Sequence, residues 1–208
     1  MRKNFFDPLI YKFVSLIIVL PIFKFIFKGN VVGKENIPKN QSFILVSNHG
    51  SLLDPPFLGH ALGLKVSFMA KAELFRIPLL SQIITACGAY PVKRGMTDRN
   101  SLKIAIKNLN DQKVIGIFID GTRQRNGRVN NPKKGAALIS ARTRKILLPI
   151  ALVNSHRLVR FKFFVPIFNR ITIKVGKPID SAKSSSKQDL SQKTIELQEN
   201  INKLLDFN

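Results

Sequence analysis

The chain has 208 residues, which is enough to bury one sizeable hydrophobic core. Hydrophobic residues make up 45% of the sequence and exclude a largely disordered chain, and the single cysteine, Cys87, excludes an internal disulfide. Lys and Arg number 34 against 12 Asp and Glu, and the net charge of +22 favours anionic partners such as nucleic acid, acidic proteins, phosphorylated substrates or an anionic membrane surface.

The first 28 residues form an apolar segment interspersed with lysines. From Phe13 to Phe23 only Ser15 is polar, and a helix over this run would be roughly 16 Å long, about half the thickness of a hydrocarbon core. Lysines follow the run, whereas a cleaved signal peptide would have small residues there. We therefore expect residues 1–28 to be a membrane-associating helical segment that lies in one leaflet, with its lysines at the headgroups. A single membrane crossing and an ordinary core helix are the alternatives.

Residues 29–180 form the next part of the chain, which begins with a loop-like stretch at 29–41. After this stretch, short apolar runs alternate with helical patterns. The sequence predicts an α/β domain there, with a mostly parallel sheet flanked by helices. The expected strands are 42–47, 65–70, 88–92, 114–119, 146–153 and 171–175, and the expected helices are 54–62, 73–86 with a break near Pro78, 98–109 and 135–144. Residues 181–208 complete the chain as a polar linker and a C-terminal amphipathic helix.

Polar residues follow the strand expected at 42–47, at the strand end where open α/β sheets bind ligands. These are Asn48 and His49, and an acid, Asp54, lies five positions after the histidine. Histidine suits a general base near neutral pH, and a carboxylate on its second ring nitrogen would fix the tautomer. On a helix this spacing would turn the two side chains about 140° apart, so the pair requires a loop that folds back. Alternatively, Asp54 is a helix N-cap and His49 an ordinary loop residue.

A second polar group follows the strand expected at 114–119. It comprises Asp120, Gly121, Thr122 and Arg123. Glycine allows a close backbone approach and arginine matches the oxygens of a phosphate, so Arg123 is a candidate phosphate ligand. The alternatives are a solvated arginine and an acid that caps a helix or forms a structural ion pair.

The two other histidines, His60 and His156, are expected to be structural or at the surface. One cysteine and three scattered histidines give no zinc-site spacing, and no nucleotide-binding glycine motif is present. We therefore expect no metal and no cofactor.

Residues 48–54 and 118–123 resemble the NHxxxxD and FPEGTR signatures of the glycerolipid acyltransferases. The segment 71–94 is similar to the block that lies between these signatures, and the resemblance covers roughly residues 30–180. The third block departs from the family, because Asp120 stands where the family has a glutamate. Aspartate keeps the charge but is shorter by one methylene, which puts the exact acceptor in question.

Membership of this family implies that His49 deprotonates an acceptor hydroxyl while Asp54 orients it. The hydroxyl then attacks an acyl thioester of coenzyme A or acyl carrier protein, which serves as co-substrate, with no acyl-enzyme. The resemblance assigns phosphate binding to Arg94, Arg123 and Lys93. It assigns the remaining motif positions to the acceptor site, namely Asn48, Asp120, Gly121 and Thr122.

The function that the resemblance implies is acyl transfer to 1-acylglycerol-3-phosphate (lysophosphatidic acid), giving phosphatidic acid. The same chemistry on glycerol-3-phosphate or another lysophospholipid is an alternative, and a basic, non-enzymatic nucleic-acid- or membrane-binding protein is an alternative of another class. No nucleic-acid motif is present, so we expect an anionic membrane surface as the partner instead. The expected location is membrane-associated, monotopic or peripheral, with the active site on the cytoplasmic side.

Overall fold

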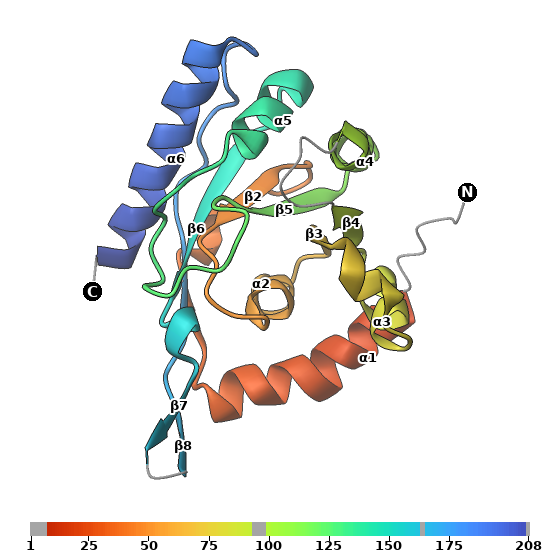
Figure 1. The fold of residues 1–208 in the computed structure, drawn as a ribbon, viewed down its shortest axis with the longest axis vertical. Coiled ribbons are helices and arrows are strands. Elements are labelled where there is room, and N and C mark those ends of the chain that lie inside the picture. The colour runs from red at the N-terminus through yellow and green to blue at the C-terminus, as the bar shows by residue number, and fades with distance from the viewer. Residues whose placement is uncertain (1–7, 93–98, 163–164, 207–208) are drawn as a thin grey trace.

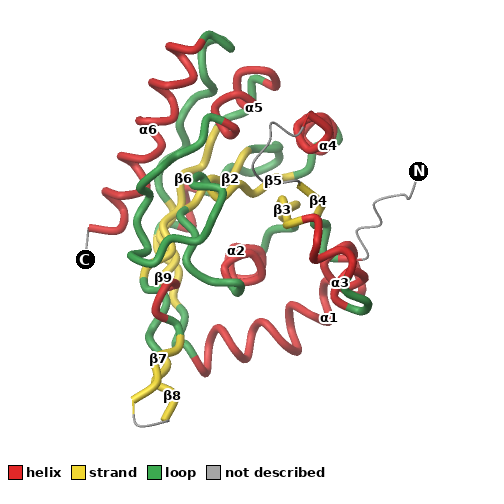
Figure 2. Tube along the Cα trace, in the orientation of Figure 1, coloured by secondary structure: helices red, strands yellow, loops and turns green. Residues whose placement is uncertain are grey.

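The computed structural model describes residues 8–92, 99–162 and 165–206, and its core is an α/β sheet with helices on both faces (Figures 1 and 2). Within these residues the strands form a seven-stranded sheet and a separate two-stranded hairpin. The seven strands, in their order across the sheet, are β1 (Asn30–Val32), β9 (Thr172–Val175), β6 (Leu147–Val153), β2 (Ile44–Ser47), β5 (Val114–Phe118), β3 (Val66–Lys71) and β4 (Tyr90–Val92).

The sheet is mixed but mostly parallel, which confirms the predicted fold class. Strands β6, β2, β5, β3 and β4 are parallel to one another, whereas β9 runs antiparallel to β6 and β1 runs parallel to β9. Two features were not predicted. Strand β1 lies within the segment expected to be a loop, and β7 (Val159–Lys162) pairs with β8 (Val165–Phe168) in the hairpin.

Helices cover both faces because the central strands are apolar on both sides. In β2, Leu45 packs in one core cluster with residues of α2, while Ile44 and Val46 pack in the other cluster with α4, α5 and α6. The α-helices that follow the N-terminal segment are α2 (Asp54–Leu62), α3 (Leu80–Ala86), α4 (Arg99–Asn110), α5 (Gly135–Thr143) and α6 (Lys187–Asp206). Short 3₁₀ turns occupy Lys34–Asn36, Ala72–Arg76 and Ser155–Arg157.

The N-terminal helix consists of α1 (Pro8–Phe13) and the π-helical turns that continue it over Val14–Val19 and Ile22–Ile26. It crosses beneath α2 (Figure 1), and its buried residues Phe23 and Phe27 both contact the ring of Phe57 in α2.

Most of the N-terminal helix nevertheless faces outward. The stretch Leu9–Ile26 is long and apolar enough to cross a membrane, and only 11% of it is buried. Polar contacts tie the helix to α2 and its C-terminal end, since the Tyr11 hydroxyl donates to the Leu64 carbonyl over 2.7 Å and Ser15 Oγ lies 2.6 Å from His60 Nδ1. Burial raises the pKa of Tyr11 to about 12, so this hydroxyl keeps its proton at neutral pH.

The central parallel strands bring the two polar groups of the sequence together. Strands β2 and β5 are neighbours in register, with Ser47 opposite Phe118. Both end at the same edge of the sheet, so residues 48–49 and 119–123 leave it side by side.

Candidate active site

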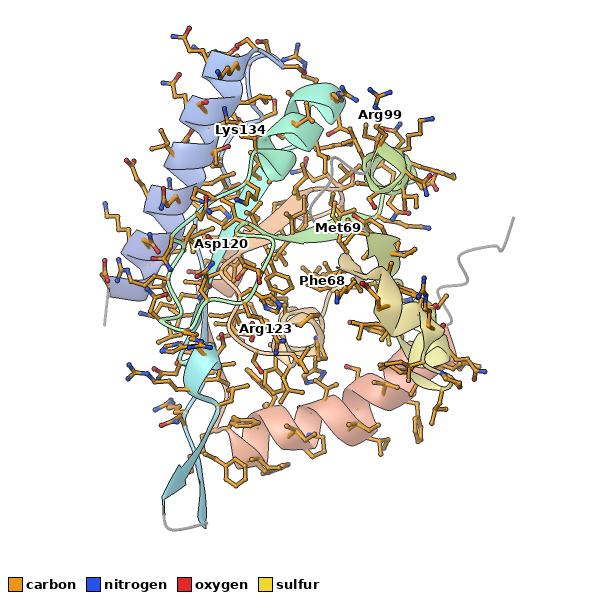
Figure 3. All side chains as sticks on the ribbon, viewed as in Figure 1. Phe68, Met69, Arg99, Asp120, Arg123 and Lys134 are labelled. Atoms are coloured by element: carbon orange, nitrogen blue, oxygen red, sulfur yellow. The ribbon has the colours of Figure 1, made fainter. Side chains whose placement is uncertain are left out.

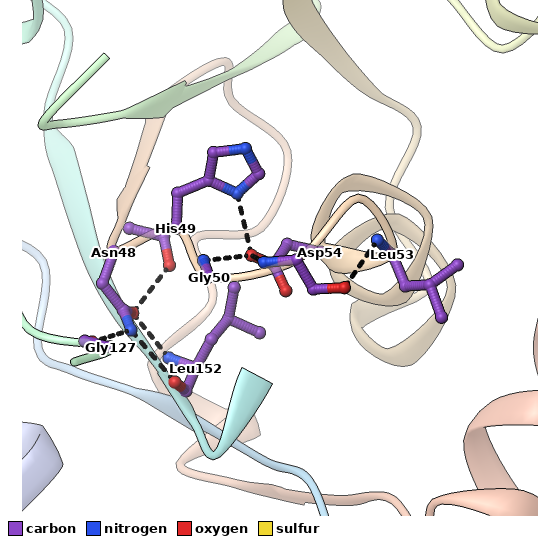
Figure 4. A network of polar contacts seen from close by, with 9 residues as sticks. Asn48, His49, Gly50, Leu53, Asp54, Gly127 and Leu152 are labelled. Carbon is purple, nitrogen blue, oxygen red and sulfur yellow. Dashed lines mark hydrogen bonds and ion pairs between the residues drawn. The ribbon is translucent and has the colours of Figure 1, made fainter. Parts of the chain in front are cut away.

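The centre of the site is a buried pair formed by His49 and Asp54. The His49 Nδ1 atom lies 2.8 Å from Asp54 Oδ2, and the histidine side chain is 9% exposed while that of the aspartate is fully buried (Figure 4). Residues 48–53 fold back to achieve this, and α2 begins directly at Asp54. Because Leu53 occupies the N-cap position and Pro55 follows in the first turn, Asp54 is not the helix cap.

The contacts of Asp54 define which nitrogen of the His49 ring carries the proton. Its Oδ2 atom also accepts hydrogen bonds from the backbone N–H groups of Gly50 and Ser51, at 2.7 and 2.8 Å. An oxygen that accepts from two backbone N–H groups carries no proton to donate, so His49 Nδ1 must donate to it. The proton on the imidazole therefore sits on Nδ1, which leaves Nε2 as the basic nitrogen, and Figure 4 shows that atom pointing away from Asp54.

Asn48 anchors the start of this loop to the sheet. Its Nδ2 group donates to the carbonyls of Gly127 (2.7 Å) and Leu152 (3.0 Å), and its Oδ1 accepts from the Leu152 N–H at 2.7 Å. The side chain is fully buried. The asparagine of the signature is thus a cross-link between the end of β2, strand β6 and the loop after β5 (Figure 4).

Replacing Asn48 with alanine is expected to lower the free energy of unfolding by about 2–5 kcal/mol, because three buried backbone groups lose their partner. Urea denaturation followed by circular dichroism measures this. Asn110→Ala is the matched control, since Asn110 is exposed at the end of α4 and its loss is expected to cost about 0.5 kcal/mol or less. Equal midpoints for the two variants would show that Asn48 is not a structural cross-link.

Aromatic rings support the His49 imidazole from one side. The Phe118 ring stacks on His49 with centroids 4.0 Å apart and planes 16° apart, and Phe68 stacks on Phe118 at 5.4 Å. Strand β5 carries Gly116 where a Cβ would collide with the Phe68 ring, so the stack requires glycine at that position. The stack limits rotation of the imidazole and covers one of its faces. The only hint in the sequence is that Phe118 opens the second motif.

Asp120 is buried and turned toward its own loop. Its Oδ1 atom accepts from the backbone N–H groups of Asn130 (3.1 Å) and Asn131 (2.6 Å). Burial raises the pKa of this carboxyl above its usual value, and the two backbone donors oppose the shift. At Gly121 the chain turns with φ of 69°, in the left-handed region that favours glycine. Asp120 therefore holds the far end of the loop in place.

Next to the loop formed by residues 48–53 lies an open pocket of about 400 Å³ with a basic lining. Arg123 is exposed at this pocket, and Figure 3 labels it near Asp120. The other lining residues are Gly50, Thr122, Gln124, Arg125 and His156. The pocket fits an anionic group beside the loop that carries His49, because guanidinium groups pair well with phosphate oxygens.

Four of the lining residues were not among the predicted site residues, namely Gly50, Gln124, Arg125 and His156. His156 was expected to be structural or at the surface, but the fold brings it from beyond β6 to the pocket. Burial and the neighbouring Arg157 lower its pKa, although Asp54 opposes this, and a neutral imidazole results at neutral pH. No sequence pattern links His156 to the motifs.

The other residues considered in the sequence analysis are not among the described residues that line this pocket. Lys93 and Arg94, expected to bind phosphate, lie outside the described residues. His60 lies on α2 facing the N-terminal helix, where it contacts Ser15. Across the part of the chain that the structure describes, no cluster of three or more His, Cys, Asp or Glu residues is placed to hold a metal ion.

Comparison with known proteins agrees with the family resemblance of the two sequence motifs. The chain matches the Acyltransferase family over residues 28–153. It is 30% identical to the 1-acyl-sn-glycerol-3-phosphate acyltransferase of Bacillus subtilis over 180 residues, covering 84% of this chain and 86% of that protein. The crystal structure of PlsC, the 1-acyl-sn-glycerophosphate acyltransferase of Thermotoga maritima, superimposes with a TM-score of 0.73 at 28% identity, covering 96% of this chain and 79% of the other.

Other relatives are longer than this chain. It is 32% identical to the 1-acyl-sn-glycerol-3-phosphate acyltransferase of Borreliella burgdorferi and 33% identical to a chloroplast enzyme of the same name from Arabidopsis thaliana. These matches take in 67% and 74% of this chain, but the chain spans only about half the length of either relative, 55% and 45%. The family match and the Bacillus subtilis relative together show that the chain belongs to the Acyltransferase family.

Proposed function

We propose that this protein transfers an acyl group from a thioester to the free hydroxyl of 1-acylglycerol-3-phosphate, giving phosphatidic acid. The observation that carries the proposal is the hydrogen bond between His49 Nδ1 and Asp54 Oδ2, beside a basic pocket. That geometry supports an activated hydroxyl next to a bound phosphate. The names of the Bacillus subtilis and Borreliella burgdorferi relatives support the same acceptor.

In the proposed mechanism, His49 Nε2 takes the proton of the acceptor hydroxyl as its oxygen attacks the thioester carbonyl. The Asp54 carboxylate, held by two backbone donors, stabilises the imidazolium that forms. The tetrahedral intermediate then collapses, the carbon–sulfur bond breaks, and the imidazolium returns its proton to the departing thiolate. The products are an ester and a free thiol, and the enzyme regains its starting protonation without an acyl-enzyme.

The acceptor phosphate is proposed to bind in the pocket at Arg123, with Arg125 adding positive charge. Lys93 and Arg94 are proposed as further phosphate ligands on the strength of the sequence motif. Either coenzyme A or acyl carrier protein is proposed as the carrier of the acyl group, since both carriers are anionic and this protein has a net charge of +22.

The N-terminal helix is proposed to hold the enzyme at an anionic membrane surface, with the active site on the cytoplasmic side. Its largely exposed apolar stretch supports this, as does the net charge of +22. The acyl chains of substrate and product would then remain in the bilayer while the phosphate reaches the pocket.

An acyl-transfer assay on the purified protein in lipid vesicles tests the function. Lysophosphatidic acid and glycerol-3-phosphate are compared as acceptors, each with acyl-coenzyme A and with acyl carrier protein as donor. We expect ester formation with lysophosphatidic acid and release of one thiol for each ester formed. Transfer to glycerol-3-phosphate alone would reassign the acceptor, and no transfer by a folded, vesicle-bound protein would refute the proposal.

A further inference from the structure

A second exposed apolar element lies in the loop between the 3₁₀ turn Ala72–Arg76 and α3. This element, the Ile77–Leu79 tip, consists of Ile77, Pro78 and Leu79. Ile77 is 48% exposed and Leu79 67% exposed, and Pro78 between them is exposed as well. Three consecutive apolar residues at a loop tip are costly in water unless another phase or molecule covers them.

The backbone of the tip is strained at Leu79. Leu79 has φ of 61° and ψ of −55°, and the Leu80 N–H donates to the Pro78 carbonyl over 2.6 Å. This is a classic γ-turn, a rare conformation for a residue with a side chain. The other non-glycine residues with positive φ in the described parts of the chain are polar: Lys28, Asn40, Gln112, Arg144 and Asn154. A strained leucine at an exposed tip indicates a function for the side chain rather than for folding.

The tip lies next to the N-terminal helix. Helix α3, which begins immediately after the tip, packs against α1. Figures 1 and 2 accordingly show α3 and the loop before it beside the N-terminal end of that helix. Leu9 and Phe13 of α1 are 78% and 62% exposed. The tip therefore adds a second exposed apolar element beside the one already present on the helix.

The charges around the tip suit an anionic lipid surface. Arg76 immediately precedes the tip and is exposed, and Lys12 is exposed on α1. Among the residues that the structure describes here, the acid Glu73 is paired with Lys71 at 3.4 Å. Apolar residues flanked by cations are typical of elements that insert at a headgroup boundary, where the cations meet lipid phosphates.

We propose that the Ile77–Leu79 tip is a second membrane contact, which inserts its apolar side chains into the same leaflet as the N-terminal helix. The inference rests on the proposed membrane association and extends it. A single helix lying in a leaflet leaves the protein free to rock about the helix axis. A second contact away from that axis removes this freedom and sets the tilt of the catalytic sheet relative to the bilayer.

The absence of tryptophan from the whole sequence allows a direct test. Three variants each carry one tryptophan: Leu79→Trp at the tip, Ile17→Trp on the N-terminal helix, and Ile195→Trp on α6. The native residues at these positions are comparably exposed, at 67%, 61% and 52%. Each variant is mixed with vesicles of brominated phosphatidylcholine and phosphatidylglycerol, and quenching of the tryptophan fluorescence is measured.

We expect the fluorescence of Leu79→Trp and Ile17→Trp to be quenched, and that of Ile195→Trp to be unchanged. Quenching of Ile17→Trp without quenching of Leu79→Trp would refute the tip as a membrane contact and leave the N-terminal helix as the membrane contact. Absence of quenching in both would overturn membrane association itself, whereas the acyl-transfer assay reports on the proposed reaction independently.

A second measurement uses vesicle flotation. Leu79→Ser is expected to weaken binding to anionic vesicles about tenfold, as the loss of one buried leucine side chain implies. Ile195→Ser is the control and is expected to bind like the native protein. If Leu79→Ser leaves vesicle binding unchanged but abolishes a concentration-dependent dimer seen by light scattering, the tip contacts a second copy of the chain and the proposal is wrong.

Discussion

Replacing His49 with alanine is expected to lower kcat for acyl transfer by about 10²–10⁴-fold, the usual contribution of a general base. The acceptor hydroxyl would then have to lose its proton to water during attack on the thioester. KM for the acceptor is expected to change little, because the pocket that would receive its phosphate is lined by other residues. The measurement is steady-state kinetics with lysophosphatidic acid as the varied substrate.

The fold of the His49→Ala variant is expected to survive. Asp54 keeps its two backbone donors from Gly50 and Ser51, and the Phe118 ring keeps its contact with Phe68. Imidazole added to the buffer is expected to restore part of the activity, since the substitution leaves room beside Asp54. The control His60→Ala removes an imidazole that faces the N-terminal helix, and its turnover should stay within severalfold of native. If His49→Ala turns over at the native rate, His49 is not the base.

Replacing Asp54 with asparagine is expected to lower kcat by about 10²–10⁴-fold while leaving the geometry nearly intact. The amide oxygen can occupy the Oδ2 position and accept from His49, Gly50 and Ser51 as the carboxylate does. The amide carries no charge, however, so it does not stabilise the imidazolium that forms during attack. The effect therefore falls on the chemical step rather than on acceptor binding.

Stability and kinetics must be measured together for Asp54→Asn. The new amide nitrogen would occupy the position of Oδ1, which is buried and has no hydrogen-bond partner in the structure, so a loss of about 1–3 kcal/mol in unfolding free energy is expected. Asp111→Asn is the matched control, because Asp111 lies at the surface in an exposed pair with Lys107. A fall in kcat no larger than that of the control would mean that the carboxylate only shapes the loop.

The strands and helices that carry the site were predictable because their signals are local. The apolar runs at 42–47 and 114–119 match β2 and β5 closely, and the polar residues after them lie at the strand ends as expected. The predicted helix break near Pro78 is also confirmed, because a 3₁₀ turn precedes this proline and α3 follows it. In each case the signal is a short run of apolar residues or a proline, which can be read from consecutive residues of the sequence.

Strands whose partners lie far away in the sequence were harder to predict. Strand β1 has three residues with a polar start, and it exists because β9 offers it a parallel edge about 140 residues later. The antiparallel direction of β9 is likewise set by its pairing with β6. Strand β1 is thus stabilised by hydrogen bonds to a neighbour rather than by its own pattern, whereas for β9 only the direction was not predicted.

The sequence by itself determined the fold class, the position of His49 at a strand end and of Asp54 at the start of the next helix, and the basic, apolar character of the chain. Only the tertiary structure decided that the two side chains meet, that Phe118 stacks on the imidazole, and that His156 joins the pocket. The physical reason is that spacing along a chain fixes direction only within one helix or strand. The conformation of a loop such as 48–53 depends on partners elsewhere in the chain. Here these partners are the backbone of β6 and of the loop after β5, which are distant in sequence and form hydrogen bonds with Asn48.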